Sequence, residues 1–309
     1  MQLEIHTHET ITWDTFLASH PKHSIALDGY VHGEPKFSLE TGHANFNHHE
    51  GVNRIATRCT AAQVAMAIKQ GLLTIMPPDE TTLWVNDCDQ DVCMSVWLLQ
   101  NWERISGTRS EPLISRLVFN VDTLDTCAGA YPIEPQSKIM QEMCWIFDPY
   151  TSARLAGKIH DASADDMRAI IEAVLHRIDL YSTGQGQKKK PDARYETLHS
   201  GNGWVLVKEL GNEARTAMRR DGIQGFVSFR GDTPEGNFIY SIGNLTPFGG
   251  LPLAKLYNSL NEIEGISQNS PNRWGGSDSC GGSPRKGGSK TNPGHLAQIL
   301  NDLLVSLKN

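Results

Sequence analysis

Residues 83–99 read LWVNDCDQDVCMSVWLL. A short apolar run ends at Asp87 and a longer one begins at Val92, which predicts a strand that turns directly into an apolar helix. Three carboxylates, those of Asp87, Asp89 and Asp91, fall in this turn. Unpaired acids at this spacing repel one another, and a bound cation relieves the repulsion. We therefore expect a metal site here; the alternative, an exposed acidic loop, fits the flanking apolar segments less well.

Similar patterns lie on both sides of this stretch. Residues 25–27 predict a short buried strand that ends at Asp28, and residues 116–121 predict a third strand that ends at Asp122. A helical spacing of apolar residues over 60–72 lies between them. Strands that alternate with helices indicate an α/β fold with a mainly parallel sheet and helices on both faces. Ligands of such sheets bind beyond the carboxyl ends of the strands, where these acids are expected to meet.

Two adjacent histidines add imidazole to the acids. His48 and His49 follow Asn47 at a predicted strand end, so that one can ligate a metal while the other meets substrate or donates a proton. The pair alone is weak evidence, because the chain has 12 histidines. Together with Asp28 before it and the three aspartates after it, the pair favours a metal centre.

The predicted ligand set is rich in carboxylate and contains one imidazole. Asp122 is preferred to Asp125 because it ends the apolar run directly, whereas Asp125 is suited to capping a following turn. Carboxylate oxygens bind hard divalent cations, and an added imidazole favours the transition-metal end of the series. The preferred ligands are Asp28, His48, Asp89, Asp91 and Asp122, with Asp87 and Asp125 as alternates.

The length of 309 residues favours two domains. The segment at 183–190 contains Gly, Gln and three lysines and is typical of a flexible linker, so we expect a metal-binding catalytic domain over 1–185, a linker over 186–194 and a substrate-binding domain over 195–309. In the last of these, strands are predicted at 204–207, 225–229 and 237–242, and helices over 253–264 and from Pro293 onward. It should therefore be a smaller α/β domain. Ser163 and Asp166 further predict a capping box before an amphipathic helix.

Charge and composition limit the partners. The formal net charge of −7 disfavours binding to long duplex nucleic acid, which depends on Lys and Arg, and favours a small phosphorylated substrate or a short oligonucleotide. No apolar run is long enough for a membrane span, and residues 1–6 resemble no signal peptide. The six cysteines have no paired spacing and are expected to be reduced. We expect a cytoplasmic protein without a membrane partner.

Residues 274–290, WGGSDSCGGSPRKGGSK, form the second unusual stretch. Glycines let backbone N–H groups approach an anion, and hydroxyl and cationic side chains add donors. The spacing is not that of a Walker motif. A flexible linker is the alternative. The predicted substrate-binding residues are Gly275, Gly276, Ser277, Gly281, Gly282, Ser283, Arg285 and Lys286.

These motifs resemble those of the DHH phosphoesterases in their RecJ-like form. The aspartates at 87–91, followed by a small and apolar helix, look like the first motif, and Asn47-His48-His49 looks like the motif that names the family. Asp28 is similar to its isolated second aspartate, and Asp122-Thr123 or Asp125-Thr126 to its fourth motif. The glycine-rich stretch is similar to the substrate-binding stretch of the associated C-terminal domain. Asn47 replaces the family's first aspartate, and the Asp-x-Asp motif follows the histidines, so the order is permuted.

The resemblance implies a hydrolase that holds two Mn²⁺ or Mg²⁺ ions and cleaves a phosphoester or phosphoanhydride with a metal-activated water. His49 is then expected to contact the phosphoryl oxygen or protonate the leaving group, and Arg285 to hold a terminal phosphate. The alternative is a metal- or nucleotide-binding protein without turnover, in which Asn47 marks a degenerate site.

Overall fold

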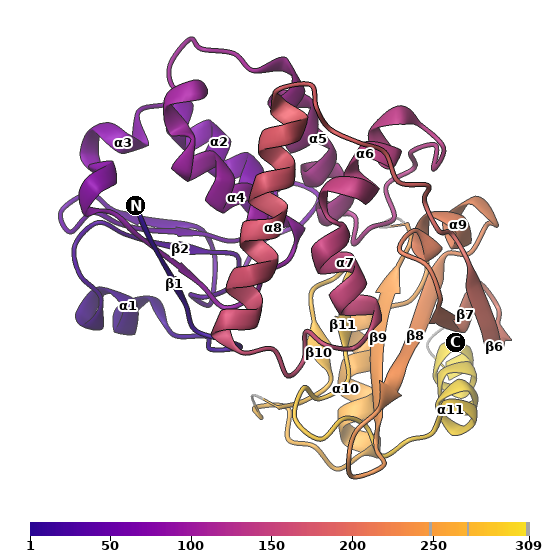
Figure 1. Cartoon of the computed structure of the whole chain (residues 1–309). Coiled ribbons are helices and arrows are strands. Elements are labelled where there is room, and N and C mark those ends of the chain that lie inside the picture. Colours follow the sequence, from indigo (N-terminus) through magenta and orange to yellow (C-terminus); the bar gives the residue numbers. More distant parts are fainter. Residues whose placement is uncertain (247–248, 271, 307–309) are drawn as a thin grey trace. The chain divides into compact units, whose positions relative to one another are not determined.

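The computed structural model describes residues 1–246, 249–270 and 272–306. The chain forms two compact units, one of Met1–Thr126 with Ser137–Lys190 and the other of Cys127–Gln136 with Pro191–Asn309. Each unit contains a sheet and helices, so the fold is mixed α/β (Figure 1). The boundary between the two units, at Lys190 and Pro191, lies within the predicted linker.

The first unit contains a mostly parallel sheet, as the sequence predicts. In spatial order its described strands are β1 (Gln2–Ile5), β5 (Thr82–Val85), β2 (Ser24–Leu27), β4 (His43–Phe46) and β3 (Lys36–Ser38). The first four are parallel and β3 is antiparallel. The strands predicted at 25–27 and 83–85 are confirmed. Because β2, β4 and β5 run in one direction, the residues that follow them emerge at one edge of the sheet.

Helices cover this sheet (Figure 1). Helix α1 (Trp13–Ser19) places Phe16 against Ala26 of β2 in a small aromatic cluster. Helices α2 (Thr60–Lys69), α4 (Gln90–Gln100) and α8 (Ala164–Ser182) also pack on the sheet or on its covering layer. Their predicted positions are confirmed, and Ser163 and Asp166 form the predicted capping box of α8.

The strand predicted over 116–121 is wrong, because these residues belong to helix α5 (Pro112–Thr126). The buried apolar residues Ile114, Leu117, Val121 and Leu124 are three or four positions apart, the spacing of one helix face. Asp122 and Asp125 therefore lie on the last turn of a helix and not at a strand end.

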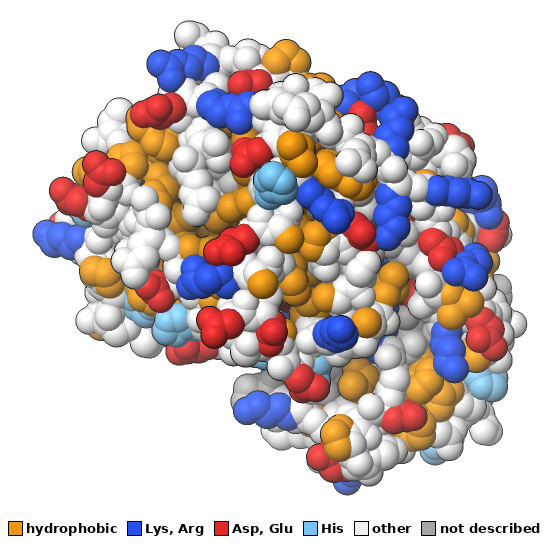
Figure 2. Space-filling view, viewed as in Figure 1, with side chains coloured by type: hydrophobic (Ala, Val, Ile, Leu, Met, Phe, Trp, Pro, Cys, Tyr) orange, Lys and Arg blue, Asp and Glu red, His pale blue; other side chains and the backbone are white. Residues whose placement is uncertain are grey.

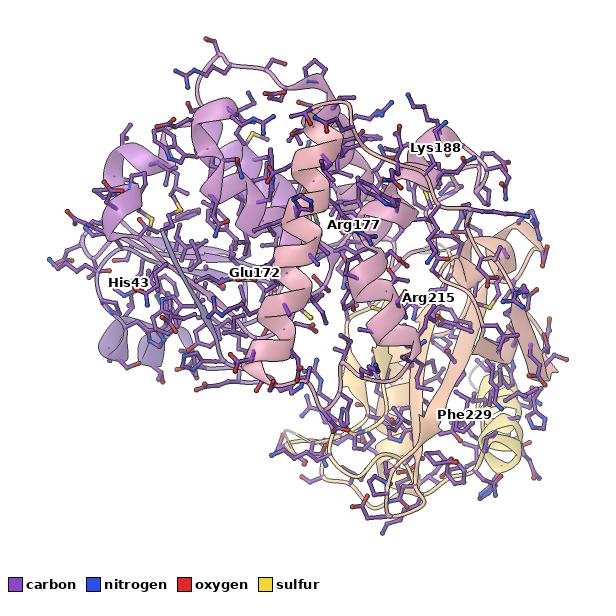
Figure 3. The ribbon with its side chains drawn as sticks, viewed as in Figure 1. His43, Glu172, Arg177, Lys188, Arg215 and Phe229 are labelled. Carbon is purple, nitrogen blue, oxygen red and sulfur yellow. The ribbon has the colours of Figure 1, made fainter. Side chains whose placement is uncertain are left out.

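The C-terminal part of α8 packs against two helices that were not predicted from the sequence, α6 (Lys138–Ile146) and α7 (Asp148–Leu155). Arg177, labelled in Figure 3, stacks on Trp145 and lies 3.6 Å from Asp148 Oδ2. Lys189 donates its backbone N–H to Gln141 and pairs its side chain with Asp148. The first part of the predicted linker thus has fixed contacts with the first unit. Short elements α3 (Leu72–Ile75), η1 (Pro78–Glu80) and η2 (Trp102–Arg104) complete the unit.

The second unit has a mixed sheet. Its described strands, in spatial order, are β10 (Gly275–Gly276), β11 (Cys280–Gly282), β9 (Phe238–Asn244), β8 (Gly225–Asp232), β7 (Trp204–Glu209) and β6 (Tyr195–Gly201). Only β7 and β8 pair in parallel among them. Helices α10 (Leu253–Ile263) and α11 (Pro293–Ser306) share one core with the sheet. The strands predicted at 204–207, 225–229 and 237–242 and both predicted helices are confirmed.

The segment Cys127–Gln136 lies between α5 and α6 in sequence but belongs to the second unit. Its Ala130 is buried in a core that includes Phe226. Arg215 of α9 (Ala214–Arg220) stacks over Phe226 and donates a 2.9 Å hydrogen bond to Ala128 O (Figure 3). The second unit is therefore assembled from two separate stretches of chain.

No helix in the described part of the chain is long and apolar enough to cross a bilayer.

Candidate metal centre

Three of the residues predicted near strand ends, Asp28, His48 and Asp91, converge at the carboxyl edge of the first sheet. Asp28 follows β2, His48 follows β4 after Asn47, and Asp91 lies in the first turn of α4, which follows β5. Asp28 has a φ of 52°, a left-handed backbone conformation that aspartate tolerates better than bulkier residues. The parallel sheet thus brings together side chains that are far apart in sequence.

His48 lies at the centre of the cluster. Its side chain is wholly buried, and its Nε2 lies 2.7 Å from Asp125 Oδ2, 3.5 Å from Asp91 Oδ2 and 3.6 Å from Asp28 Oδ1. Neither ring nitrogen has a partner in hydrogen-bond geometry among the described residues. Burial opposes protonation of the ring, but Asp125, Asp28 and Asp91 outweigh it and raise the pKa of His48. An imidazole nitrogen that faces three carboxylate oxygens at 2.7–3.6 Å fits a cation site.

Among the described residues, two overlapping groups of donors have the spacing needed to hold a metal ion. One consists of Asp28, His48 and His49, and the other of His48, Asp91 and Asp125; within each group the ligand atoms lie within 4.8 Å of one another. Carboxylates with one or two imidazoles suit Mn²⁺ well and Mg²⁺ through the carboxylates. Because His48 belongs to both groups, two ions would have to divide these donors between them.

The N-terminus of α2 holds Asp91. The backbone N–H groups of Thr60 and Ala61 each donate a 2.7 Å hydrogen bond to its carboxylate, and the Thr60 hydroxyl donates to Asp28 Oδ1 at 2.8 Å. Burial, reinforced by the charges of Asp28 and Asp125, nevertheless raises the pKa of Asp91 to about 7. A bound cation would favour its ionised form.

Arg54 connects the two donor groups. One of its terminal nitrogens donates to the backbone oxygen and Oδ2 of Asp125, at 2.7 and 3.1 Å. The other lies 3.4 Å from His49 Nδ1, and His49 Nε2 lies 3.0 Å from Asp28 Oδ1. Sequence reasoning singled out neither Arg54 nor Thr60. The only available signal was that Thr60 begins a predicted helix.

The preferred ligand Asp122 lies elsewhere. It accepts a 2.8 Å hydrogen bond from the Cys59 N–H, just before α2, and a 3.0 Å hydrogen bond from Arg58. It belongs to neither donor group, and the alternate, Asp125, lies in the cluster. The helical form of residues 116–121 explains the difference, since it turns Asp125 and not Asp122 toward His48.

The three aspartates of residues 87–91 have different positions. Asp91 belongs to a donor group, whereas Asp89 caps α4 by accepting a 2.9 Å hydrogen bond from Val92 N, and Asp87 accepts one of 2.6 Å from Cys88 N. Burial and then the charges of Asp28 and Asp87 raise the pKa of Asp89 well above its ordinary value. Asp89 and Asp87 thus border the cluster without belonging to either group.

The glycine-rich stretch forms a tight hairpin of β10 and β11. A Cβ on Gly276 would lie 2.3 Å from Gly281 Cα, and one on Gly281 would lie 2.2 Å from Gly275 O, so close strand pairing already requires these glycines. Ser277 Oγ accepts the N–H of Cys280 in the turn. The other predicted members are Gly282 within β11, the buried Ser283, whose hydroxyl accepts the Tyr240 N–H, and the exposed Arg285 and Lys286.

Comparisons with models of protein families, with curated proteins and with solved structures find no match to this chain. The resemblance to the DHH phosphoesterases therefore stays a prediction from the motifs.

The contact between Asp28 and His49 predicts a pH dependence of the metal-free protein. Burial disfavours the charged form of both groups, but the attraction between them has the larger effect on both pKa values. Asp28 raises the pKa of His49 from 6.5 to about 10, and His49 lowers the pKa of Asp28. The stability from protonated His49 is complete below pH 6.5 and is lost as the pH rises through about 10. The stability from ionised Asp28 is present above its ordinary value of 3.8 and is lost in acid.

Urea denaturation between pH 5 and 10 in EDTA measures this effect. The difference in unfolding free energy between the wild type and His49→Gln should be largest near pH 5–6 and shrink toward pH 10. A difference that does not change with pH would show that His49 carries no such charge.

Proposed function

We propose that this chain is a metal-dependent phosphoesterase that holds two divalent cations, Mn²⁺ or Mg²⁺, in its first unit and hydrolyses a phosphoester or phosphoanhydride. The observation that carries the proposal is the wholly buried His48, whose Nε2 lies within 3.6 Å of carboxylate oxygens of Asp28, Asp91 and Asp125. Buried carboxylates and imidazoles at this spacing are costly unless a cation neutralises them. The motif resemblance points to the same class of reaction.

The residues of the two donor groups would hold the ions, with Asp89 and Asp87 nearby. Bound cations of this kind activate a water molecule and neutralise phosphoryl oxygens. Arg54 lies 3.4 Å from Nδ1 of His49 and Asp28 Oδ1 lies 3.0 Å from its Nε2, so the two contacts hold the orientation of the ring. His49 is thereby suited to the proposed contact with a phosphoryl oxygen or leaving group.

The proposed substrate is small or short. The formal net charge is −7, and Figure 2 shows Lys and Arg side chains intermixed with Asp and Glu over the visible face of the first unit. A continuous basic surface, which long nucleic acid would require, is not seen on that face. Within the second unit, Arg285 and Lys286, exposed after the glycine hairpin, are proposed to bind a phosphate group because of their charge.

Two measurements on the wild type test the function. Mn²⁺ titration should give about two ions per chain, and a panel of bis(p-nitrophenyl) phosphate, pyrophosphate, dinucleotides and short oligonucleotides should contain a substrate that is hydrolysed with Mn²⁺ but not with EDTA. Restoring Mn²⁺ after EDTA should restore the activity. One ion, or none, with ligand binding and no hydrolysis would instead support a metal- or nucleotide-binding protein without turnover.

A further inference from the structure

Asn47 lies directly before the two histidines and is wholly buried. Its side-chain oxygen accepts the backbone N–H of His48 at 2.8 Å and that of His49 at 3.1 Å. The amide oxygen therefore fixes the turn from which both imidazoles enter the cluster. This part of its role needs only an oxygen acceptor, which aspartate would also supply.

The amide nitrogen has a separate role. It donates to Gly33 O at 2.8 Å, to Val31 O at 3.4 Å and to Glu50 Oε2 at 3.1 Å. All three neighbours are acceptors, and Glu50 has few competing donors nearby: Gly33 N at 3.5 Å and the exposed His32 at 3.8 Å. The surroundings of this nitrogen thus require a donor.

A carboxylate at position 47 could not replace the contacts of the amide nitrogen. Its first oxygen would still accept from the two histidine N–H groups, but its second would face two carbonyl oxygens and the Glu50 carboxylate. The buried carboxylate would be repelled by the carboxylate of Glu50, whose side chain is 41% exposed, and the three acceptors would lose their donor. The side chains around Asn47 are therefore matched to an amide.

We propose that Asn47 is the positioning residue of the two-histidine turn and that Glu50 is the partner that makes an amide necessary there. This inference rests on the proposed function in assigning the turn to a metal centre. Asn47 is then a supporting residue of the metal centre and not the mark of a degenerate site.

A double-mutant cycle tests the pairing through Mn²⁺ affinity, followed by electron paramagnetic resonance of free and bound Mn²⁺. Asn47→Asp should weaken binding roughly 10–100-fold, as loss of an outer-shell partner does. Glu50→Gln alone should change the Mn²⁺ affinity little. Combined with Asn47→Asp, it should restore the affinity by on the order of tenfold, because it removes the charge repulsion. Imidazole-nitrogen modulation of the bound Mn²⁺ signal should weaken in Asn47→Asp and return in the double variant.

Asn45→Asp is the matched control. Asn45 is wholly buried two positions earlier, on β4, and its amide nitrogen donates to Glu34 O at 3.1 Å. No described contact joins it to either histidine, so Asn45→Asp should lower the melting temperature without the change in Mn²⁺ affinity or its rescue by Glu50→Gln.

The backbone amide resonances of His48 and His49 in the metal-free protein separate this inference from the proposed function. They should shift in Asn47→Asp and return toward wild type in the double variant. If the wild type does not bind Mn²⁺ but the two resonances shift in Asn47→Asp and return in the double variant, the metal centre is refuted and the pairing of Asn47 with Glu50 is supported. Unchanged resonances in Asn47→Asp, or no recovery by Glu50→Gln in either measurement, would refute the pairing.

Discussion

Mn²⁺ binding is expected to disappear when His48 is replaced by glutamine. His48 is the only residue common to both donor groups, so its loss removes a nitrogen ligand from each. We expect the affinity to fall by more than about 100-fold, above the effect typical of an outer-shell partner, and metal-dependent hydrolysis to fall with it. Isothermal titration with Mn²⁺ and the hydrolysis assay measure the two effects.

The same substitution should destabilise the metal-free protein. His48 faces three buried or half-buried carboxylates that raise its pKa, and removing one partner of such a buried cluster costs about 3–5 kcal/mol. Urea denaturation in EDTA measures this cost, and circular dichroism shows whether the variant is folded under the titration conditions.

His43→Gln is the matched control for His48→Gln. His43, labelled in Figure 3, is also buried and begins the strand that His48 follows, but its ring contacts Thr41 Oγ1 and His20 O. It belongs to neither donor group. Its substitution should leave Mn²⁺ binding intact. Equal Mn²⁺ affinities in His48→Gln and the wild type would rule out His48 as a ligand.

The parts of this site that follow strands were accessible from the sequence. Asp28 comes directly after the apolar run at 25–27, His48 lies at a predicted strand end after Phe46 and Asn47, and Asp91 follows the apolar run at 83–85 across a tight turn. Parallel strands bring their carboxyl ends to one edge, so the strand pattern alone predicts that these three side chains meet. Each is found at that edge.

The helical part of the site could not be predicted from the sequence in the same way. Residues 116–121 are apolar enough for a strand, and the helix period became visible only over the longer span from Ile114 to Leu124. Arg54 lies in an irregular turn whose tertiary contacts no local pattern encodes. The segment Cys127–Gln136 is likewise assigned to the second unit by contacts with residues some 90 positions away, such as Arg215.

Replacing Asp125 should have the second large effect on metal binding, and replacing Asp122 should not. The two carboxylates lie one turn apart on α5 and have different surroundings. Asp125→Asn should remove one donor group, lower the Mn²⁺ stoichiometry from about two to about one and reduce hydrolysis by about 100-fold or more. An asparagine keeps an oxygen acceptor for Arg54, so the effect on the surrounding turn should be small.

Asp122→Asn should leave both ions in place. An asparagine oxygen still accepts the Cys59 N–H, and the lost ion pair is with Arg58, whose side chain is 57% exposed, so its loss should cost at most about 1 kcal/mol. Mn²⁺ stoichiometry and hydrolysis should therefore match the wild type. The reverse outcome, in which Asp122→Asn loses an ion and Asp125→Asn does not, would assign the ligand to the residue that ends the apolar run. It would also require the last turn of α5 to rearrange when metal binds, since Asp122 is now occupied at the start of α2.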